Sequence, residues 1–150
     1  MSTTNQELTT VLNDLIATCN DSWEGFGKAA KGVHGDQFRN WLTDVSLQRA
    51  GFARRLSDEV RKAGGEPAQE GHGGGILHRG WVDLETRLRS KNDGEIRTEC
   101  IRGEESTLKH YERAVEQYMP DEVRLIVERQ FNEIQATLKE LREGRVHAPR

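Results

Sequence analysis

Residues 121–143 read DEVRLIVERQFNEIQATLKELRE, and their apolar side chains recur at steps of three and four. Such steps place the apolar residues on one face of a helix, whereas a half-buried strand would alternate at every second residue. The same rhythm runs through three earlier stretches, at 8–33, 38–63 and 96–118. Because each helix must bury its apolar face against another, four of them predict an all-α four-helix bundle.

Turn-forming residues between these stretches set the expected ends of the helices. Gly32 and Gly35 interrupt the chain after the first stretch, Gly64 and Gly65 follow the second, and Pro120 separates the last two. A chain of 150 residues is long enough to bury one continuous core, so we expect a single domain over residues 1–150. The expected helices lie at about 6–31, 36–63, 94–119 and 121–143.

A long connection joins the two halves of the chain. It begins with a glycine-rich segment at 64–75 that cannot form regular helix, and a pattern of helical spacing around Trp81 then predicts a short extra helix at 77–90. A connection of this length can travel the whole bundle and let the second and third long helices run parallel. We therefore predict the ferritin-like topology, with one long crossover, rather than an up-down-up-down bundle.

Composition and charge narrow the range of partners. Hydrophobic residues make up 34% of the chain and charged residues 31%, with a net charge of −3 and both signs interleaved. A nucleic-acid-binding protein would show a basic surplus, and no stretch approaches the apolar length of a membrane span. Residues 1–7 contain no basic segment followed by an apolar run, so we expect a cytoplasmic protein that binds neither nucleic acid nor membrane.

The two cysteines lie on apolar stripes, and we expect both to be buried free thiols. Along their predicted helices, Cys19 and Cys100 differ in height by about 10 Å, which is beyond the reach of a disulfide. No pair of cysteines, or of cysteine and histidine, has the spacing typical of zinc ligands.

Several short stretches resemble a known protein family. They are Leu12–Ile16, Glu24–Phe26, Gln48–Ala50, Gly64–Pro67, Leu77–Trp81 and Arg102–Glu105. On these stretches the chain resembles small, mostly proteobacterial ferritin-like four-helix-bundle proteins that share a domain of unknown function. The resemblance implies a fold and a bacterial origin, and it defines no activity.

Ferritin-like proteins that perform chemistry hold two metal ions at mid-bundle through glutamates and Glu-x-x-His pairs. This chain has five histidines, and none of them has a glutamate three residues before it. We therefore expect no catalytic residue, no cofactor and no bound metal. The resulting interpretation is a non-catalytic helical-bundle protein, active as an interaction or stress-associated protein.

A polar layer at mid-bundle leaves an alternative open. The polar residues predicted on or near this layer are Asn20, Glu24, Gln48, Glu104, Gln130 and Glu133. The simpler interpretation is a buried hydrogen-bonded layer in which Glu104 pairs with Arg49. The alternative is a degenerate carboxylate site for iron or manganese in a metal-binding or redox protein.

Two further hypotheses concern the surface. A groove beneath the connection could carry a small ligand, with His78 and Arg79 at its edge, although Trp81 could equally pack the short helix onto the bundle. Trp41 lies beside the main apolar stripe rather than on it, so a homodimer also stays open.

Overall fold

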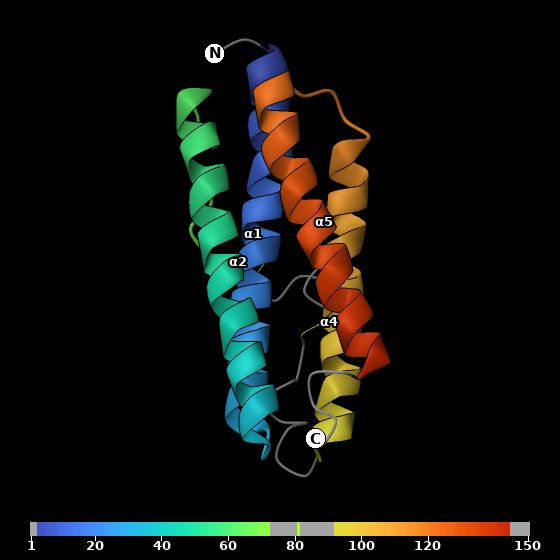
Figure 1. Cartoon of the computed structure of the whole chain (residues 1–150). Helices are drawn as coiled ribbons and strands as arrows, with labels where there is room; N and C mark the ends of the chain where they lie inside the picture. Colours follow the sequence, from blue (N-terminus) through green and yellow to red (C-terminus); the bar gives the residue numbers. More distant parts are fainter. Residues whose placement is uncertain (1–2, 73–80, 82–91, 145–150) are drawn as a thin grey trace.

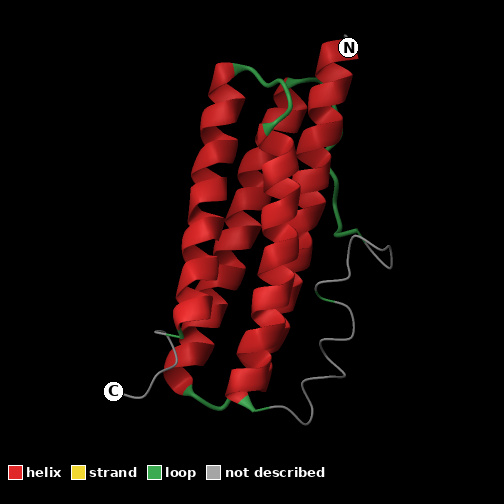
Figure 2. Cartoon of the chain, turned by 90° about the vertical axis from the view of Figure 1, so that its right-hand side faces the viewer, coloured by secondary structure: helices red, strands yellow, loops and turns green. Residues whose placement is uncertain are grey.

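Four long helices form the protein in the computed structural model, which describes residues 3–72, 81 and 92–144 (Figure 1). The helices are α1 (Thr3–Gly32), α2 (Asp36–Lys62), α4 (Asp93–Val115) and α5 (Asp121–Glu143). They pack side by side as a bundle, and the described residues contain no strand (Figure 2). The all-α four-helix bundle predicted from the apolar rhythm is confirmed.

The helices follow the ferritin-like topology. In Figure 1, α1 descends, α2 and α4 both rise, and α5 descends again. The starts of α2 and α4 meet at one end, where the Asp93 carboxylate accepts the backbone N–H groups of His34 and Gly35 at 2.8 and 2.9 Å. Because α2 ends at the opposite end, the connection to α4 has to travel the length of the bundle, as predicted.

Local sequence explains where most helices begin and end. Asn92 caps α4 through a capping box, since its side chain accepts the Glu95 N–H while the Glu95 carboxylate accepts the Asn92 N–H. Gly64, just beyond α2, has φ 84°, and Gly144, just beyond α5, has φ 69°. These left-handed conformations favour glycine, which lacks a Cβ.

Two helix ends differ from the expected bounds: the C-terminal end of α4 and the N-terminal end of α1. α4 ends at Val115 rather than at 119, because residues 116–120 reverse the chain and Pro120 disfavours helical geometry in the residue before it. The Arg124 guanidinium donates to the free carbonyls of Val115 and Gln117 at 2.9 and 2.6 Å, which stabilises this turn. α1 begins at Thr3 instead of residue 6. The helix predicted at 77–90 lies outside the described residues, apart from Trp81.

Buried apolar side chains form two clusters, one toward each end of the bundle. One cluster includes Leu12, Leu56 and Tyr111, and the other includes Phe26 and Ile96. Polar residues lie in the sequence between the members of the two clusters on both α2 and α4. The core is therefore interrupted near mid-bundle by a polar level.

Trp81 anchors the connection to the bundle. Its side chain is 7% exposed and meets Phe26 edge-on, with the ring centroids 5.0 Å apart. A Cβ added at Gly25 of α1 or at Gly103 of α4 would lie 2.1 or 2.3 Å from the indole ring. The two glycines thus leave a slot between α1 and α4 that the ring fills, and the predicted packing of Trp81 onto the bundle is confirmed.

Both cysteines are free and fully buried, as predicted. Burial raises the pKa of the Cys19 thiol to about 11 and that of Cys100 still further. Within the described part of the chain, no helix combines the length and apolar character needed to cross a lipid bilayer.

Candidate metal centre

The middle of the bundle is filled by an ion pair between Arg49 of α2 and Glu104 of α4. Both side chains are 0% exposed, and the guanidinium donates to the two carboxylate oxygens at 2.6 and 2.5 Å. The pairing predicted for Glu104 is therefore present. Two fork-like hydrogen bonds of this kind satisfy a carboxylate more strongly than a single neutral donor would.

The surroundings of Arg49 are adapted to a permanent cation. Its guanidinium lies 5.4 Å from the centroid of the Phe26 ring and 5.8 Å from that of Phe52, and its Nε donates to Gln48. Burial lowers the pKa of Arg49, but the charge and hydrogen bonds of Glu104 offset this and hold the pKa above its usual value. A fixed positive charge that already occupies the central carboxylate disfavours a second cation at this level.

Only part of the predicted polar layer faces the interior. Gln130 is buried and accepts the Tyr111 hydroxyl at 2.7 Å, while its amide donates to the Phe52 carbonyl at 3.4 Å. Gln48 is half-buried and donates to Glu133 at the surface, at 3.3 Å. Glu24 and Glu133 are exposed, and Asn20 lies half-buried between α1 and α2. The prediction that Asn20 belongs to the central layer was wrong, because a residue beside the apolar stripe points along the helix–helix boundary rather than into the core. Glu24 and Glu133, predicted near the layer, lie at the surface.

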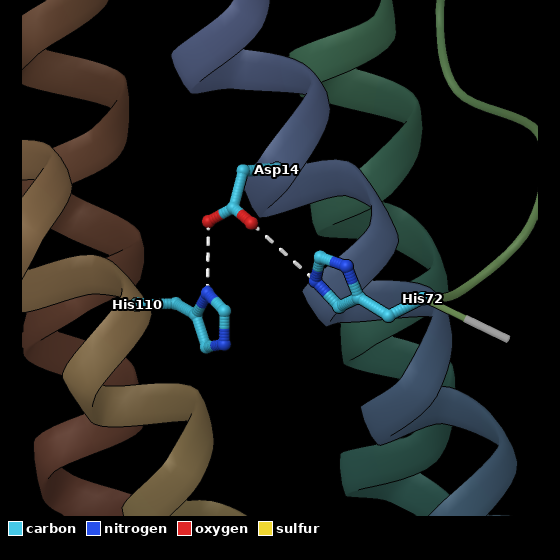
Figure 3. Close-up of side chains that lie close together, drawn as sticks. All are labelled: Asp14, His72 and His110. Atoms are coloured by element: carbon cyan, nitrogen blue, oxygen red, sulfur yellow. Dashed lines mark hydrogen bonds and ion pairs between the residues drawn. The ribbon is translucent and has the colours of Figure 1, made fainter. Parts of the chain in front are cut away.

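A second cluster of polar side chains lies outside this layer. Asp14 of α1 and His110 of α4 face each other, and His72 reaches them from the connection (Figure 3). Each oxygen of the carboxylate faces one of the two imidazole rings, and the rings stack with their centroids 5.2 Å apart. Side-chain exposure is 37% for Asp14, 13% for His72 and 4% for His110, so the cluster opens to solvent on the Asp14 side.

The ligand atoms of these three residues are close enough to share one ion. His110 Nδ1 lies 2.8 Å from Asp14 Oδ2, and His72 Nε2 lies 3.4 Å from Asp14 Oδ1. All three ligand atoms fall within 4.8 Å of one another. Two atoms bound to one zinc ion can be at most about 4.4 Å apart, so both distances from the Asp14 carboxylate are compatible with a shared ion.

The hydrogen bonds define which nitrogens carry protons. Thr18 donates its hydroxyl proton to the Asp14 carbonyl at 2.8 Å, so His72 Nε2 must donate to Thr18 Oγ1 at 3.2 Å. His110 Nδ1 likewise donates to the carboxylate. An ion bound at these two nitrogens would require each ring to carry its proton on the other ring nitrogen instead.

The position of His72 is set by α1. The Asp21 carboxylate accepts the His72 backbone N–H at 3.2 Å, and Gly71 lies so close to it that an added Cβ would be 1.9 Å from Asp21 Oδ1. Farther back, the Asn13 amide donates to the Glu66 carbonyl at 2.9 Å and accepts the Ala68 N–H at 2.8 Å. The position of the His72 imidazole is therefore fixed by hydrogen bonds between α1 side chains and the backbone of the connection.

The donor set indicates the kind of ion. Two imidazole nitrogens and one carboxylate suit zinc, iron(II), manganese(II) or cobalt(II), whereas calcium and magnesium prefer oxygen ligands. Three protein ligands also leave coordination positions free for water.

Sequence reasoning missed this cluster. His110 lies next to the buried stripe residue Tyr111, which is a signal in the sequence, but a Glu-x-x-His motif within one helix would not include it. His72 was placed in the glycine-rich segment at 64–75, to which no site was assigned. Its contact with Asp14 depends on the path of the connection, which no periodicity reports.

Taken together, the topology and the polar sites define a ferritin-like bundle with a His/carboxylate cluster beside its core. A ferritin-like, diiron-carboxylate protein from Bacillus anthracis aligns with a TM-score of 0.72 and 20% identity, covering 95% of this chain and 98% of that chain. A bacterioferritin from Desulfovibrio desulfuricans, described with a diiron site, aligns with a TM-score of 0.58 and 15% identity, covering 93% and 78%. At these identities the likeness shows the fold alone.

The family is shown by sequence. Residues 7–117 match the domain of unknown function DUF2383, and the chain belongs to that family. The resemblance to ferritin-like bundles of unknown function is thereby confirmed. No curated protein matches the chain.

Proposed function

We propose that this protein binds one divalent transition-metal ion through Asp14, His72 and His110, and that it does so without the di-metal chemistry of its structural relatives. The observation that carries the proposal is the convergence of two imidazole nitrogens and a carboxylate from three separate segments within 4.8 Å. Iron and manganese, the ions considered from the sequence, fit this donor set, as do zinc and cobalt.

The bundle centre supports the second half of the proposal. Di-iron proteins of this fold place carboxylates and Glu-x-x-His pairs at mid-bundle. Here the buried carboxylate of Glu104 is held by both guanidinium nitrogens of Arg49. A cation at that point would have to displace a bidentate ion pair in a water-excluded core, which is unfavourable.

Isothermal titration of the metal-free protein with Co²⁺ and Zn²⁺ tests the site. We expect one ion per chain, with Mg²⁺ failing to compete, and a visible Co²⁺ spectrum characteristic of mixed nitrogen and oxygen ligation. His110→Gln and Asp14→Asn should each weaken binding by about 100-fold or more, since even outer hydrogen-bond partners of a ligand contribute 10–100-fold.

His34→Gln is the matched control, because His34 is an exposed histidine at the turn between α1 and α2. It should leave metal affinity unchanged. Asp14→Asn retains an oxygen that accepts from His110, so circular dichroism should show a folded protein. Absence of binding to the native protein would contradict the proposal and would leave the cluster with the structural role of hydrogen-bonding the connection to the bundle. Binding that survives all ligand substitutions would place the ion elsewhere, including at the mid-bundle carboxylates.

Aerobic addition of Fe²⁺ tests the absence of di-iron chemistry. We expect ferric species to appear no faster than in protein-free buffer. Oxidation accelerated by the protein and unaffected by His110→Gln would overturn the non-catalytic proposal and leave the metal-binding one standing.

A further inference from the structure

A groove runs between α1 and α2 on a different side of α1 from the metal cluster. Its floor is apolar, formed by Ile16, Ala50 and Ala53, and Trp23 stands at one end with 45% of its surface exposed. The groove is open to solvent and has a volume of about 600 Å³, within the range of about 300–1,000 Å³ typical of small-molecule sites. The residues that line it on α1 recur at helical spacing and so share one face of the helix.

The start of the connection lines the other end of the groove and is held there by hydrogen bonds to α1. Ala68 and Gln69 line it there, and Ala68 is held in place by the Asn13 side chain. The same amide also donates to the Glu66 carbonyl, so this segment is tied to α1 on both sides. A site that is built before its ligand arrives loses less entropy on binding.

Polar groups in the groove favour an anion. Arg61 pairs with Asp58 at 3.3 Å, whereas Arg54 forms no ion pair with any acidic side chain in the described part of the chain. The groove therefore carries one uncompensated positive charge beside its apolar floor. Asn20 adds a half-buried amide with no hydrogen bond to the described residues.

We propose that this groove binds a small amphipathic carboxylate. The flat or aliphatic body of the ligand lies on Ile16 and Ala53 against the Trp23 ring, and its carboxylate accepts hydrogen bonds from Arg54. Asn20 supplies a further donor. The chemistry of the lining selects a singly charged organic anion over a neutral or cationic analogue of the same shape.

Nuclear magnetic resonance titration of the full chain with 2-naphthoate tests the proposal. The indole N–H resonance of Trp23, assigned with Trp23→Phe, should shift saturably, while 2-naphthylmethanol and 2-naphthylmethylammonium should bind at least about 10-fold more weakly, as expected when a charge-assisted hydrogen bond is lost. Arg54→Glu should weaken naphthoate binding by a similar factor, and Ala50→Trp should block it by filling the groove.

Arg129→Glu is the matched control, because it makes the same charge change at an exposed position of α5. It should leave naphthoate binding unchanged. Three outcomes overturn the proposal: no saturable shift with the native protein, equal binding of the cationic analogue, or binding that is insensitive to Arg54→Glu. A Trp23 shift that depends on protein concentration without naphthoate would show a second copy in the groove, which also overturns it.

Discussion

Arg49 carries a full charge inside a core that is otherwise apolar on both sides. Its stability there depends on Glu104, which supplies both the opposite charge and two hydrogen bonds. Burying such a pair brings little net stability, but removing one partner leaves an uncompensated charge in a medium of low polarity. Arg49 and Glu104 therefore fix the position of α2 relative to α4 across the bundle, and they contribute little to the net free energy of folding.

Glu104→Gln should lower the free energy of unfolding by about 3–5 kcal/mol, measured by urea denaturation. The sequence alone predicts a mild effect, because an amide keeps the hydrogen bonds and removes a desolvated charge, but a fully buried guanidinium cannot be neutralised by an amide. The double variant Arg49→Met/Glu104→Leu should recover most of the loss. Glu105→Gln, which breaks an exposed pair with Arg142, should cost at most about 1 kcal/mol. A cost below 1 kcal/mol for Glu104→Gln would contradict the argument.

The thiols should be inert in the native protein. Burial raises the pKa of Cys19 to about 11, so at pH 8 the reactive thiolate is scarce and also shielded. We expect an aromatic disulfide reagent to label Cys19 and Cys100 at the rate of global unfolding, and to label both at once in denaturant. Rapid labelling of either thiol in native buffer would place it at the surface.

The same pKa shift predicts a loss of stability at high pH. The unfolded Cys19 thiol ionises near its usual value of 9.0, whereas the native thiol keeps its proton until about pH 11. The stabilisation is complete below pH 9 and is lost as the pH rises toward 11, because the unfolded state releases its proton first. Cys19→Ala should flatten the dependence of unfolding free energy on pH between 9 and 11. An unchanged slope would show that other groups, such as Tyr111, dominate.

At the scale of elements, the connection between α2 and α4 is held against the bundle by specific contacts, as the helices are. Asn13 and Asp21 of α1 form hydrogen bonds with its backbone, and Trp81 packs between α1 and α4. A helical glycine normally weakens its helix, so glycines at both walls of the slot are explained by the room that the indole ring needs.

Gly103→Ala should destabilise the protein by about 1–3 kcal/mol, because the new methyl group overlaps a rigid ring. Gly51→Ala on α2 is the control, since its nearest neighbour, the flexible end of Arg54, would be 3.7 Å away, and it should stabilise by about 0.5–1 kcal/mol. In a Trp81→Ala background, Gly103→Ala should cease to be harmful. Thermal denaturation of the native protein and the four variants measures these differences, and a harmless Gly103→Ala in the native background would exclude the slot.

At the scale of the molecule, the metal cluster joins α1, the connection and α4. Its ligands come from distant parts of the chain, so the unfolded state does not contain the site, and a bound ion stabilises only the native state. Metal binding at Asp14, His72 and His110 therefore requires the native arrangement of α1, the connection and α4.

Zn²⁺ at 100 times its dissociation constant should stabilise the protein by about 2.7 kcal/mol, which raises the Tm of a chain of this size by roughly 5–10 °C. Scanning calorimetry with and without the ion measures the shift. The shift should vanish in His72→Gln and persist in His34→Gln. A shift of equal size in both variants would assign the stabilisation to nonspecific binding.

The periodic part of the structure was predictable from the sequence. Apolar residues at steps of three and four specify helices, Pro120 and Gly144 mark their ends, and the length of the connection favours parallel α2 and α4. Cys19 and Cys100 were correctly placed in the core because a buried stripe is a local property of one helix. Even the Arg49–Glu104 pair followed from the rule that a buried carboxylate needs a partner.

Only the tertiary structure decided which polar residues meet. Asn20 was predicted in the central layer, with Glu24 and Glu133 near it, yet Asn20 lies between helices and both glutamates lie at the surface. A rotation of a few tens of degrees about a helix axis separates the core from the boundary. The contact of Asp14 with His72 depends on how the connection folds over α1, through backbone hydrogen bonds that leave no periodic trace in the sequence. Periodicity encodes the face of an element, whereas a site requires the relative placement of several elements, which packing alone determines.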